Sequence, residues 1–111
     1  MSKSPTTIEH APILNLPPIH PGEILRDELD ELDELGLSAN ALARALDVPP
    51  NRITEVLNGT RAVSADTALR LARYFGSSAR FWMNLQLSFD LAVAEQEHGD
   101  MIARQVRPRA A

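Results

Sequence analysis

The sequence predicts an all-α fold of five helices, and three observations support this. Leucine and alanine dominate the apolar residues, which make up 44% of the 111-residue chain, whereas aromatic residues make up 5%. Apolar residues recur at the i, i+3, i+4 and i+7 spacing of an amphipathic helix. Serine, proline and glycine stand where the helices are expected to begin and end. Leucine and alanine favour helix over strand, so no sheet is predicted.

The first helix is expected to begin at Pro21, with His20 near the cap position, and to end at Gly36 as a C-cap. Its apolar stripe is formed by Leu25, Leu29 and Leu32. Around that stripe lies an acidic repeat, DELDELDEL, at residues 27–35. The sequence therefore predicts an amphipathic helix with an acidic outer face.

A second and a third helix are expected on either side of the segment DVPP, residues 47–50. Ser38 is the expected N-cap of the second helix. The residue before a proline is pushed out of the α region, so the second helix cannot comfortably continue through Val48. The two prolines suit the connection and the first turn of the third helix, which is expected to stop at Asn58.

The last two predicted helices begin after serine residues, Ser64 and Ser78, and Gly76 separates them. The fifth helix has two apolar stripes on roughly opposite faces: Phe81, Leu85, Phe89 and Ala92 on one, and Met83, Leu87, Leu91 and Ala94 on the other. A helix that is apolar on both sides needs a second burial partner in a domain of this size. A second copy of the chain is the expected partner.

The chain is expected to be one helical domain with two tails. Residues 1–18 contain four prolines and predict an extended or disordered N-terminal tail. Residues 19–98 hold the five predicted helices, of which the last is expected to mediate dimerisation. Residues 99–111 carry three arginines and one acidic side chain and predict a flexible basic tail.

Composition also bears on the compartment and on the partners. The chain has no cysteine, so neither a disulfide framework nor a thiolate metal site can form. No stretch approaches the roughly 20 apolar residues of a membrane span, and the N-terminal residues lack the apolar core of a signal peptide. A cytoplasmic protein with no membrane partner is expected. The formal net charge of −4 argues against indiscriminate coating of nucleic acid.

The segment ALARALDVPPNRITEVLNG, residues 41–59, is typical of a helix-turn-helix unit. Counted from Ala39, the apolar residues at its core positions are Leu42, Ala43, Leu46, Val48, Ile53 and Val56. Glycine is commonest where this chain has Asp47, because that turn residue tends to adopt a left-handed conformation. Aspartate tolerates this conformation better than most side chains do. An αα-hairpin with no nucleic-acid role is the alternative interpretation.

A helix-turn-helix unit places the outer face of its second helix in the major groove of DNA. The side chains predicted to contact bases are Asn51, Arg52, Thr54, Glu55 and Asn58. Asparagine pairs with adenine, arginine with guanine, glutamate with the cytosine amine and the threonine methyl group with thymine. The residues better placed for phosphates are Ser38, Asn40, Thr60 and Arg61. An ordinary solvated helix face is the alternative.

Three segments of the chain resemble a known family: IHPGEILRDEL, LSANALARALDVPPNRITEVLNGTRAVSADTALRLARYFG and ARFWMNLQLSFDLAVAEQE. They are similar to the HigA-type antitoxins, which are lambda-repressor-like (XRE/Cro-cI type) regulators of toxin–antitoxin operons. The resemblance covers roughly residues 19–98. It implies a five-helix fold, a homodimer, and repression of the chain's own operon through double-stranded operator DNA. It also implies neutralisation of a small RelE-like ribonuclease toxin.

Two further surfaces follow from these expectations. The hydrophobic core or the dimer interface is predicted to include Phe81, Trp82, Leu85 and Phe89, and purely intramolecular packing is the alternative for Trp82. RNA-cleaving toxins are typically basic, so the acidic residues Asp30, Glu31, Asp33 and Glu34 are hypothesised to steer and hold the toxin. A solvated acidic face is the alternative for these four.

Enzymatic chemistry finds no support in the sequence. The three histidines, His10, His20 and His98, have no metal-ligand spacing, and no catalytic residue, metal site or cofactor is predicted. Two other function classes stay open. One is a stand-alone or prophage-type transcriptional repressor without a toxin partner, and the other is an interaction module that uses the same helices without binding DNA.

Overall fold

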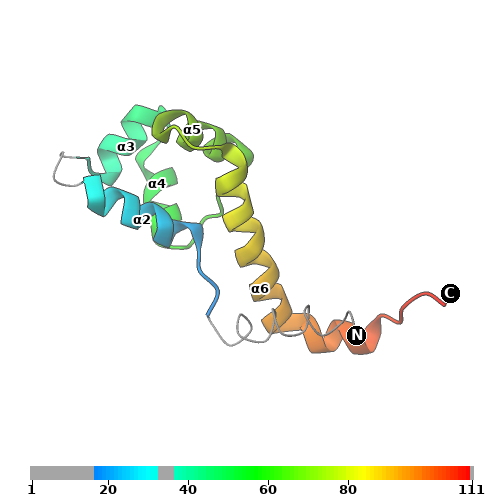
Figure 1. Ribbon diagram of the computed structural model, residues 1–111. Helices are drawn as coiled ribbons and strands as arrows, with labels where there is room; N and C mark the ends of the chain where they lie inside the picture. The colour runs from blue at the N-terminus through cyan, green and yellow to red at the C-terminus, as the bar shows by residue number, and fades with distance from the viewer. Residues whose placement is uncertain (1–16, 33–36, 111) are drawn as a thin grey trace. The chain divides into compact units, whose positions relative to one another are not determined.

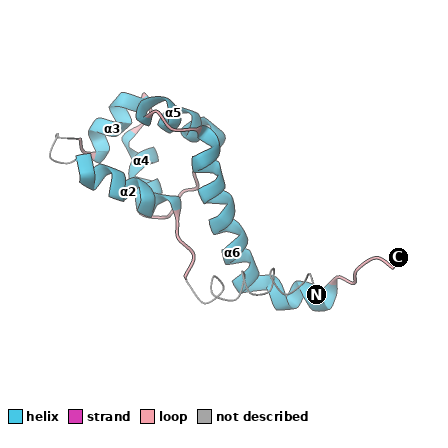
Figure 2. Ribbon diagram, viewed as in Figure 1, coloured by secondary structure: helices cyan, strands magenta, loops and turns pink. Residues whose placement is uncertain are grey.

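A computed structural model of the chain describes residues 17–32 and 37–110. These residues form five α-helices: α2 (Pro21–Leu32), α3 (Ala39–Leu46), α4 (Pro50–Leu57), α5 (Ala65–Phe75) and α6 (Ala79–Gln105) (Figure 1). No residue within these two ranges belongs to a β-strand (Figure 2). The predicted all-α class is confirmed. None of the described helices combines the length and the apolar content that crossing a bilayer requires.

The chain divides into two compact units. Residues 19–89 form one unit, which contains α2 to α5 and the first part of α6. The described residues of the other unit are 17–18 and 90–110, which include the rest of α6.

Helix α6 extends beyond the expected end of the helical domain at residue 98. Residues 99–105 are helical, so the predicted flexible tail is wrong for this stretch. The segment loses its apolar periodicity but contains methionine, alanine, arginine and glutamine, at residues 101 and 103–105. These residue types have high intrinsic helix propensity, which sustains a helix without an apolar stripe. Periodicity alone therefore predicted too short a helix.

Three serines cap the helices as predicted. Ser38, Ser64 and Ser78 each accept a hydrogen bond from the backbone N–H three residues further on, over 3.1, 3.2 and 3.0 Å. Each bond satisfies one of the backbone donors that the first turn of a helix leaves unpaired, and such a cap contributes about 1 kcal/mol.

The first and last residues of other helices also match the sequence pattern. His20 precedes α2, and its Nδ1 accepts a hydrogen bond of 2.9 Å from the N–H of Gly22. Gly76 ends α5 with a left-handed φ of 74°. Gly36, the expected C-cap of the first helix, lies outside the described residues.

The hydrophobic core of residues 19–89 lies between the helices and confirms the predicted inner faces of α3 and α4. Helix α3 packs against α4 and α5, and α4 packs against α2. The buried apolar side chains are Leu25, Leu29, Leu42, Ala43, Leu46, Ile53, Val56, Val63, Ala68, Leu71 and Trp82. A Cβ at Gly22 would collide with the carbonyl oxygen of Val56. Glycine at this position therefore allows the close approach of α2 to α4.

Candidate nucleic-acid interface

The turn between α3 and α4 has the geometry of a helix-turn-helix corner. Asp47 adopts the left-handed conformation, with φ 58° and ψ 50°, and is the one non-glycine residue with positive φ in the described ranges. The N–H of Val48 donates to the carbonyl of Ala43 over 3.0 Å, which closes the last turn of α3. Pro49 is extended and Pro50 occupies the first turn of α4. The left-handed turn residue expected at Asp47 is confirmed.

Arg70 of α5 binds this turn from outside. Its Nη1 donates to the carbonyl oxygens of Leu46 and Asp47, over 2.8 and 3.3 Å. Carbonyl groups at the C-terminal end of a helix lack intrahelical partners and carry partial negative charge, so a guanidinium stabilises them. This role of Arg70 was not predicted from the sequence. The spacing of Asp66 and Arg70, four residues apart on a predicted helix, was the available signal.

Asp66 of α5 binds both Arg70 and Arg52, and Arg52 lies on α4, the third of the five predicted helices. Its Oδ2 accepts from Nε of Arg70 over 2.9 Å and from Nη1 of Arg52 over 2.7 Å. The hydrogen bond from Arg70 holds the pKa of Asp66 below its ordinary value of 3.8, and the Arg52 hydrogen bond and both positive charges act in the same direction. Desolvation opposes this shift. These ion pairs are exposed, so they orient side chains more than they stabilise the fold.

The outer face of α4 contains two kinds of predicted base-contacting residue. Asn51 and Asn58 are exposed at the two ends of the helix. Thr54 lies between them, and its hydroxyl donates to the carbonyl of Asn51 over 3.3 Å. These three side chains are polar and uncharged, so they are suited to direct contact with base edges.

The charged residues of the same face are held in ion pairs. Arg52 is bound by Asp66, as described above, and Nη2 of Arg61 lies 2.7 Å from Oε1 of Glu55. Arg61 comes from the loop after α4, so this pair fixes the loop to the helix. Both pairs are accessible to solvent, so each arginine is oriented by a carboxylate and is not fixed by burial.

The predicted phosphate-contacting residues lie on the exposed surface at two helix ends. Ser38 and Asn40 are exposed at the start of α3. Thr60 is exposed in the loop after α4, and its hydroxyl donates to the carbonyl of Glu55 over 3.2 Å. All nine predicted DNA-contacting residues thus come from the start of α3, from α4 and from the loop that follows it.

A buried amide fixes that loop from the inside. Oε1 of Gln86 on α6 accepts a hydrogen bond of 2.7 Å from the backbone N–H of Val63. Gln86 is 5% exposed, so the bond is shielded from water. This role of Gln86 was not predicted, because a single glutamine on a helix gives no signal that distinguishes an internal hydrogen bond from a solvated side chain.

The four residues predicted for the core or the dimer interface differ in exposure. Trp82 is 1% exposed and its Nε1 donates to the hydroxyl of Ser77 over 3.1 Å, so it belongs to the core of the protomer. The interface interpretation of Trp82 is therefore corrected in favour of intramolecular packing. Phe81 is 45% exposed, and Leu85 and Phe89 are partly buried. Contact of these three with a second copy stays a prediction.

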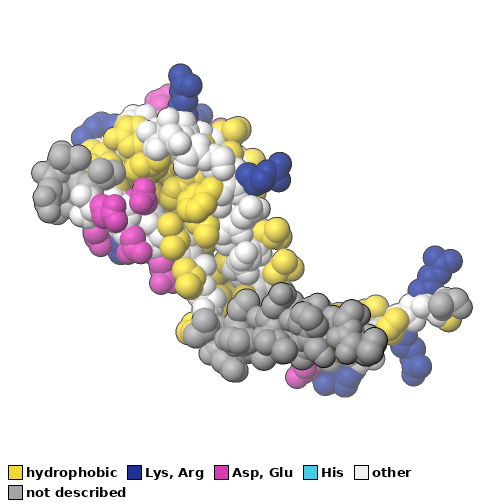
Figure 3. All heavy atoms as spheres, viewed as in Figure 1, with side chains coloured by type: hydrophobic (Ala, Val, Ile, Leu, Met, Phe, Trp, Pro, Cys, Tyr) yellow, Lys and Arg dark blue, Asp and Glu magenta, His cyan; other side chains and the backbone are white. Residues whose placement is uncertain are grey.

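Of the residues predicted to contact a toxin, Asp30 and Glu31 are exposed on α2. Asp33 and Glu34 lie outside the described residues. Acidic side chains gather over α2 beside a hydrophobic surface (Figure 3).

Comparison with known proteins places this geometry in a family. Residues 30–82 match the helix-turn-helix protein family. Virulence-associated protein I of Dichelobacter nodosus is 56% identical over 82 residues, which cover 74% of each chain. An addiction module antidote protein of the HigA family from Coxiella burnetii is 50% identical and superimposes with a TM-score of 0.80, over 85% of this chain and all of that one.

The Pseudomonas aeruginosa antitoxin HigA, whose structure includes the higBA promoter, is 48% identical with a TM-score of 0.76. That match covers 84% of this chain and 99% of the other. The helix-turn-helix family of antitoxins and transcription regulators to which the two solved structures belong is not a family of enzymes. The chain belongs to the HigA family of helix-turn-helix antitoxins.

Proposed function

We propose that this chain is a sequence-specific, DNA-binding transcriptional repressor and the antitoxin of a type II toxin–antitoxin module. It acts in the cytoplasm as a homodimer that binds double-stranded operator DNA in its own promoter. It also neutralises a RelE-like ribonuclease toxin. The observation that carries the proposal is the α3–turn–α4 unit, whose outer face is polar, in a chain 48% identical to an antitoxin solved with its promoter.

In this proposal α4 lies in the major groove. Asn51 and Asn58 pair with adenine edges, Arg52 pairs with guanine, and the methyl group of Thr54 contacts thymine. Glu55 accepts from a cytosine amine or keeps Arg61 in position. The phosphate contacts come from Ser38, Asn40, Thr60 and Arg61.

Dimerisation supplies the second recognition helix. The formal charge of −4 gives little general attraction to DNA, so binding depends on a few local cations and on two-fold symmetry. Two α4 helices about 34 Å apart fit successive major grooves of a palindromic operator. The exposed apolar side chains of α6, including Leu87 and Leu91, support the pairing of two copies through this helix.

A gel shift with the promoter of the chain's own gene tests the DNA-binding role. Simultaneous replacement of Asn51, Thr54 and Arg61 by alanine should abolish the specific complex. The control Arg109→Ala removes one cation outside the α4 face and should retain binding. If the triple variant binds the promoter as the native chain does, α4 is not the DNA-contacting face.

Co-expression with the protein encoded beside this chain's gene, followed by a pull-down, tests the antitoxin role. The expected partner is a basic protein, because the exposed carboxylates of α2 attract positive charge. Replacement of Asp30, Glu31, Asp33 and Glu34 by serine should slow association at low salt and leave the rate unchanged at high salt. A repressor that binds its promoter but captures no neighbouring protein would be a stand-alone regulator.

A further inference from the structure

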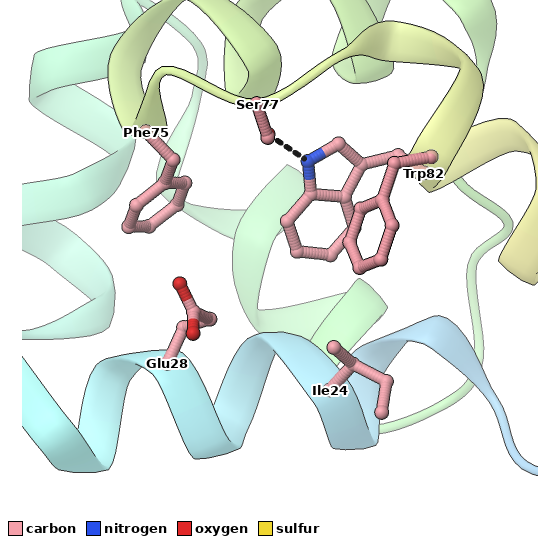
Figure 4. A pocket seen from close by; sticks show the side chains of 6 residues that line it. Ile24, Glu28, Phe75, Ser77 and Trp82 are labelled. Atoms are coloured by element: carbon pink, nitrogen blue, oxygen red, sulfur yellow. Dashed lines mark hydrogen bonds between the residues drawn. The ribbon is translucent and has the colours of Figure 1, made fainter.

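A small pocket in the unit of residues 19–89 is lined by none of the predicted DNA-contacting residues. It has a volume of about 210 Å³ and is lined by Ile24, Glu28, Phe75, Ser77, Phe81 and Trp82, which we call the aromatic pocket (Figure 4). Drug-sized ligands occupy pockets of about 300–1,000 Å³. The aromatic pocket therefore suits one side chain or a small ion rather than a larger molecule.

Three aromatic rings form much of its lining. The ring centroids of Phe81 and Trp82 are 5.1 Å apart at an interplanar angle of 81°, and those of Phe75 and Trp82 are 6.4 Å apart at 38°. The face of an aromatic ring carries partial negative charge and attracts a cation placed over it. Phe81 is 45% exposed, so its ring is accessible from solvent.

A single carboxylate stands beside these rings. Glu28 is half-buried on α2, and Figure 4 shows its carboxylate pointing from α2 toward the ring of Phe75. The indole N–H of Trp82 already donates to the hydroxyl of Ser77 over 3.1 Å. An anion would therefore meet a negative charge and an occupied donor, whereas a cation would meet a carboxylate and aromatic faces.

The surrounding charge also favours a positive ligand. Asp27, Asp30 and Glu31 are exposed on the same helix, against one exposed cation of α2, Arg26. A second, larger pocket, of about 500 Å³ between α3 and α5, has the opposite character because Arg70 and Arg73 line it. Charge thus directs a basic partner to α2 rather than to α5.

We propose that the aromatic pocket binds an arginine side chain of a basic protein partner. The carboxylate of Glu28 receives the guanidinium through two parallel hydrogen bonds, and the rings of Phe75 and Phe81 pack against its flat faces. Arginine fits better than lysine because the guanidinium is planar, is weakly hydrated and presents donors in a fixed fork. The identification of that partner as the toxin rests on the proposed function, whereas the arginine chemistry does not.

The arginine chemistry is tested with the full chain and two small probes, N-acetyl-arginine amide and N-acetyl-citrulline amide. Citrulline has nearly the shape of arginine but no charge. Trp82 is the one tryptophan of the chain, so its fluorescence reports directly on the pocket. Arginine amide should give a saturable change, and citrulline amide should give none at the same concentration. Equal responses to the two probes, or no response to arginine amide, would overturn the proposal.

Matched variants identify the pocket residues. Glu28→Gln should lower the affinity for the arginine probe by at least about fivefold, because it removes the charge-assisted hydrogen bonds. Phe81→Leu keeps an apolar side chain but removes the aromatic face, and it should lower the affinity for the arginine probe by about threefold. Asp27→Asn removes the same charge from the exposed face of α2 and should change the affinity by less than twofold. Equal losses in Glu28→Gln and Asp27→Asn would mean that only the net charge of α2 matters.

The protein encoded beside this chain's gene provides the second arm. Glu28→Gln should raise the dissociation rate of that complex several-fold more than Asp27→Asn does, because a buried contact governs dissociation and an exposed charge mainly governs association. Capture that is unaffected by Glu28→Gln would overturn the proposal for the pocket and leave the antitoxin function intact. Absence of any capture, together with binding of the arginine probe, would overturn the antitoxin function and leave the pocket intact.

Discussion

Oδ2 of Asp66 lies 2.7 Å from Nη1 of Arg52, so the arginine of α4 that is best suited to guanine is held by a carboxylate of α5. The same oxygen is bound by Arg70, whose Nη1 also donates to the carbonyl of Leu46. These contacts form a continuous path from the end of α3 through α5 to α4. Asp66 therefore orients Arg52 and Arg70 together, and removing its charge should alter both the DNA face and the turn.

Asp66→Asn should lower the preference for operator over unrelated DNA. The change releases Arg52 from its fixed position and removes a negative charge beside this proposed base contact. Binding to a scrambled duplex should therefore strengthen, and the ratio of operator to scrambled affinity should fall by about threefold to tenfold. Fluorescence anisotropy with both duplexes at one salt concentration measures this ratio.

Asp100→Asn is the control for this experiment. Asp100 is exposed on α6 and its replacement makes the same change in net charge. The affinity ratio of this variant should equal that of the native chain. If both variants shift the ratio equally, general charge explains the effect and the contact between Asp66 and Arg52 does not.

The stabilisation from Asp66 should depend on pH with a definite sign. Its pKa is lowered from 3.8 in the folded chain, chiefly by the hydrogen bond from Arg70. A group whose pKa is depressed by folding stabilises the fold above its unfolded pKa and loses that contribution as the pH falls through its folded pKa. The difference in unfolding free energy between the native chain and Asp66→Asn should be constant above about pH 5 and disappear in more acidic solution.

Urea unfolding of both proteins over a series of pH values measures this difference. Because Asp66 is exposed, the difference should also shrink in 1 M salt, where the Debye length is about 3 Å. A difference that grows on acidification would contradict the assigned direction of the pKa shift.

Gln86→Met should destabilise the fold through the loop after α4. Methionine fills a similar volume but cannot accept the hydrogen bond from the N–H of Val63, which is then buried without this partner. The expected loss in unfolding free energy is about 1–3 kcal/mol. The control Gln96→Met changes an exposed residue of α6 and should cost less than about 0.5 kcal/mol. Similar thermal midpoints for the two variants would exclude the structural role of the buried amide.

Gly22 and Gly99, the glycines within the described helices, should respond to alanine in opposite directions. A Cβ at Gly22 would meet the carbonyl oxygen of Val56, so Gly22→Ala must push α2 away from α4 at a cost of about 1–3 kcal/mol. A Cβ at Gly99 would meet the carboxylate of Glu95, which is the flexible end of a side chain and can move away. Gly99→Ala should therefore stabilise α6 by up to about 1 kcal/mol. Chemical denaturation measures both changes, and a stable Gly22→Ala protein would contradict the close packing of α2 and α4.

The local sequence determined most of the fold. Serine caps, a left-handed aspartate and two prolines act within three or four residues of their own positions, so they specify α3, the turn and α4 without tertiary information. The spacing of apolar residues located the inner faces of α3 and α4 for the same reason. It predicted too early an end for α6, because a helix can continue on intrinsic propensity where no apolar stripe marks it.

Only the tertiary structure decided how the side chains of the candidate sites are paired. Asp66 and Arg52 are 14 positions apart, Gln86 and Val63 are 23 apart, and Glu28 and Phe75 come from different helices of one pocket. Likewise, the sequence predicted Trp82 equally well for the core or for an interface, and its burial required the fold. A one-dimensional pattern records which face of a helix is apolar, but hydrogen bonds and pockets depend on which faces meet and at what distance.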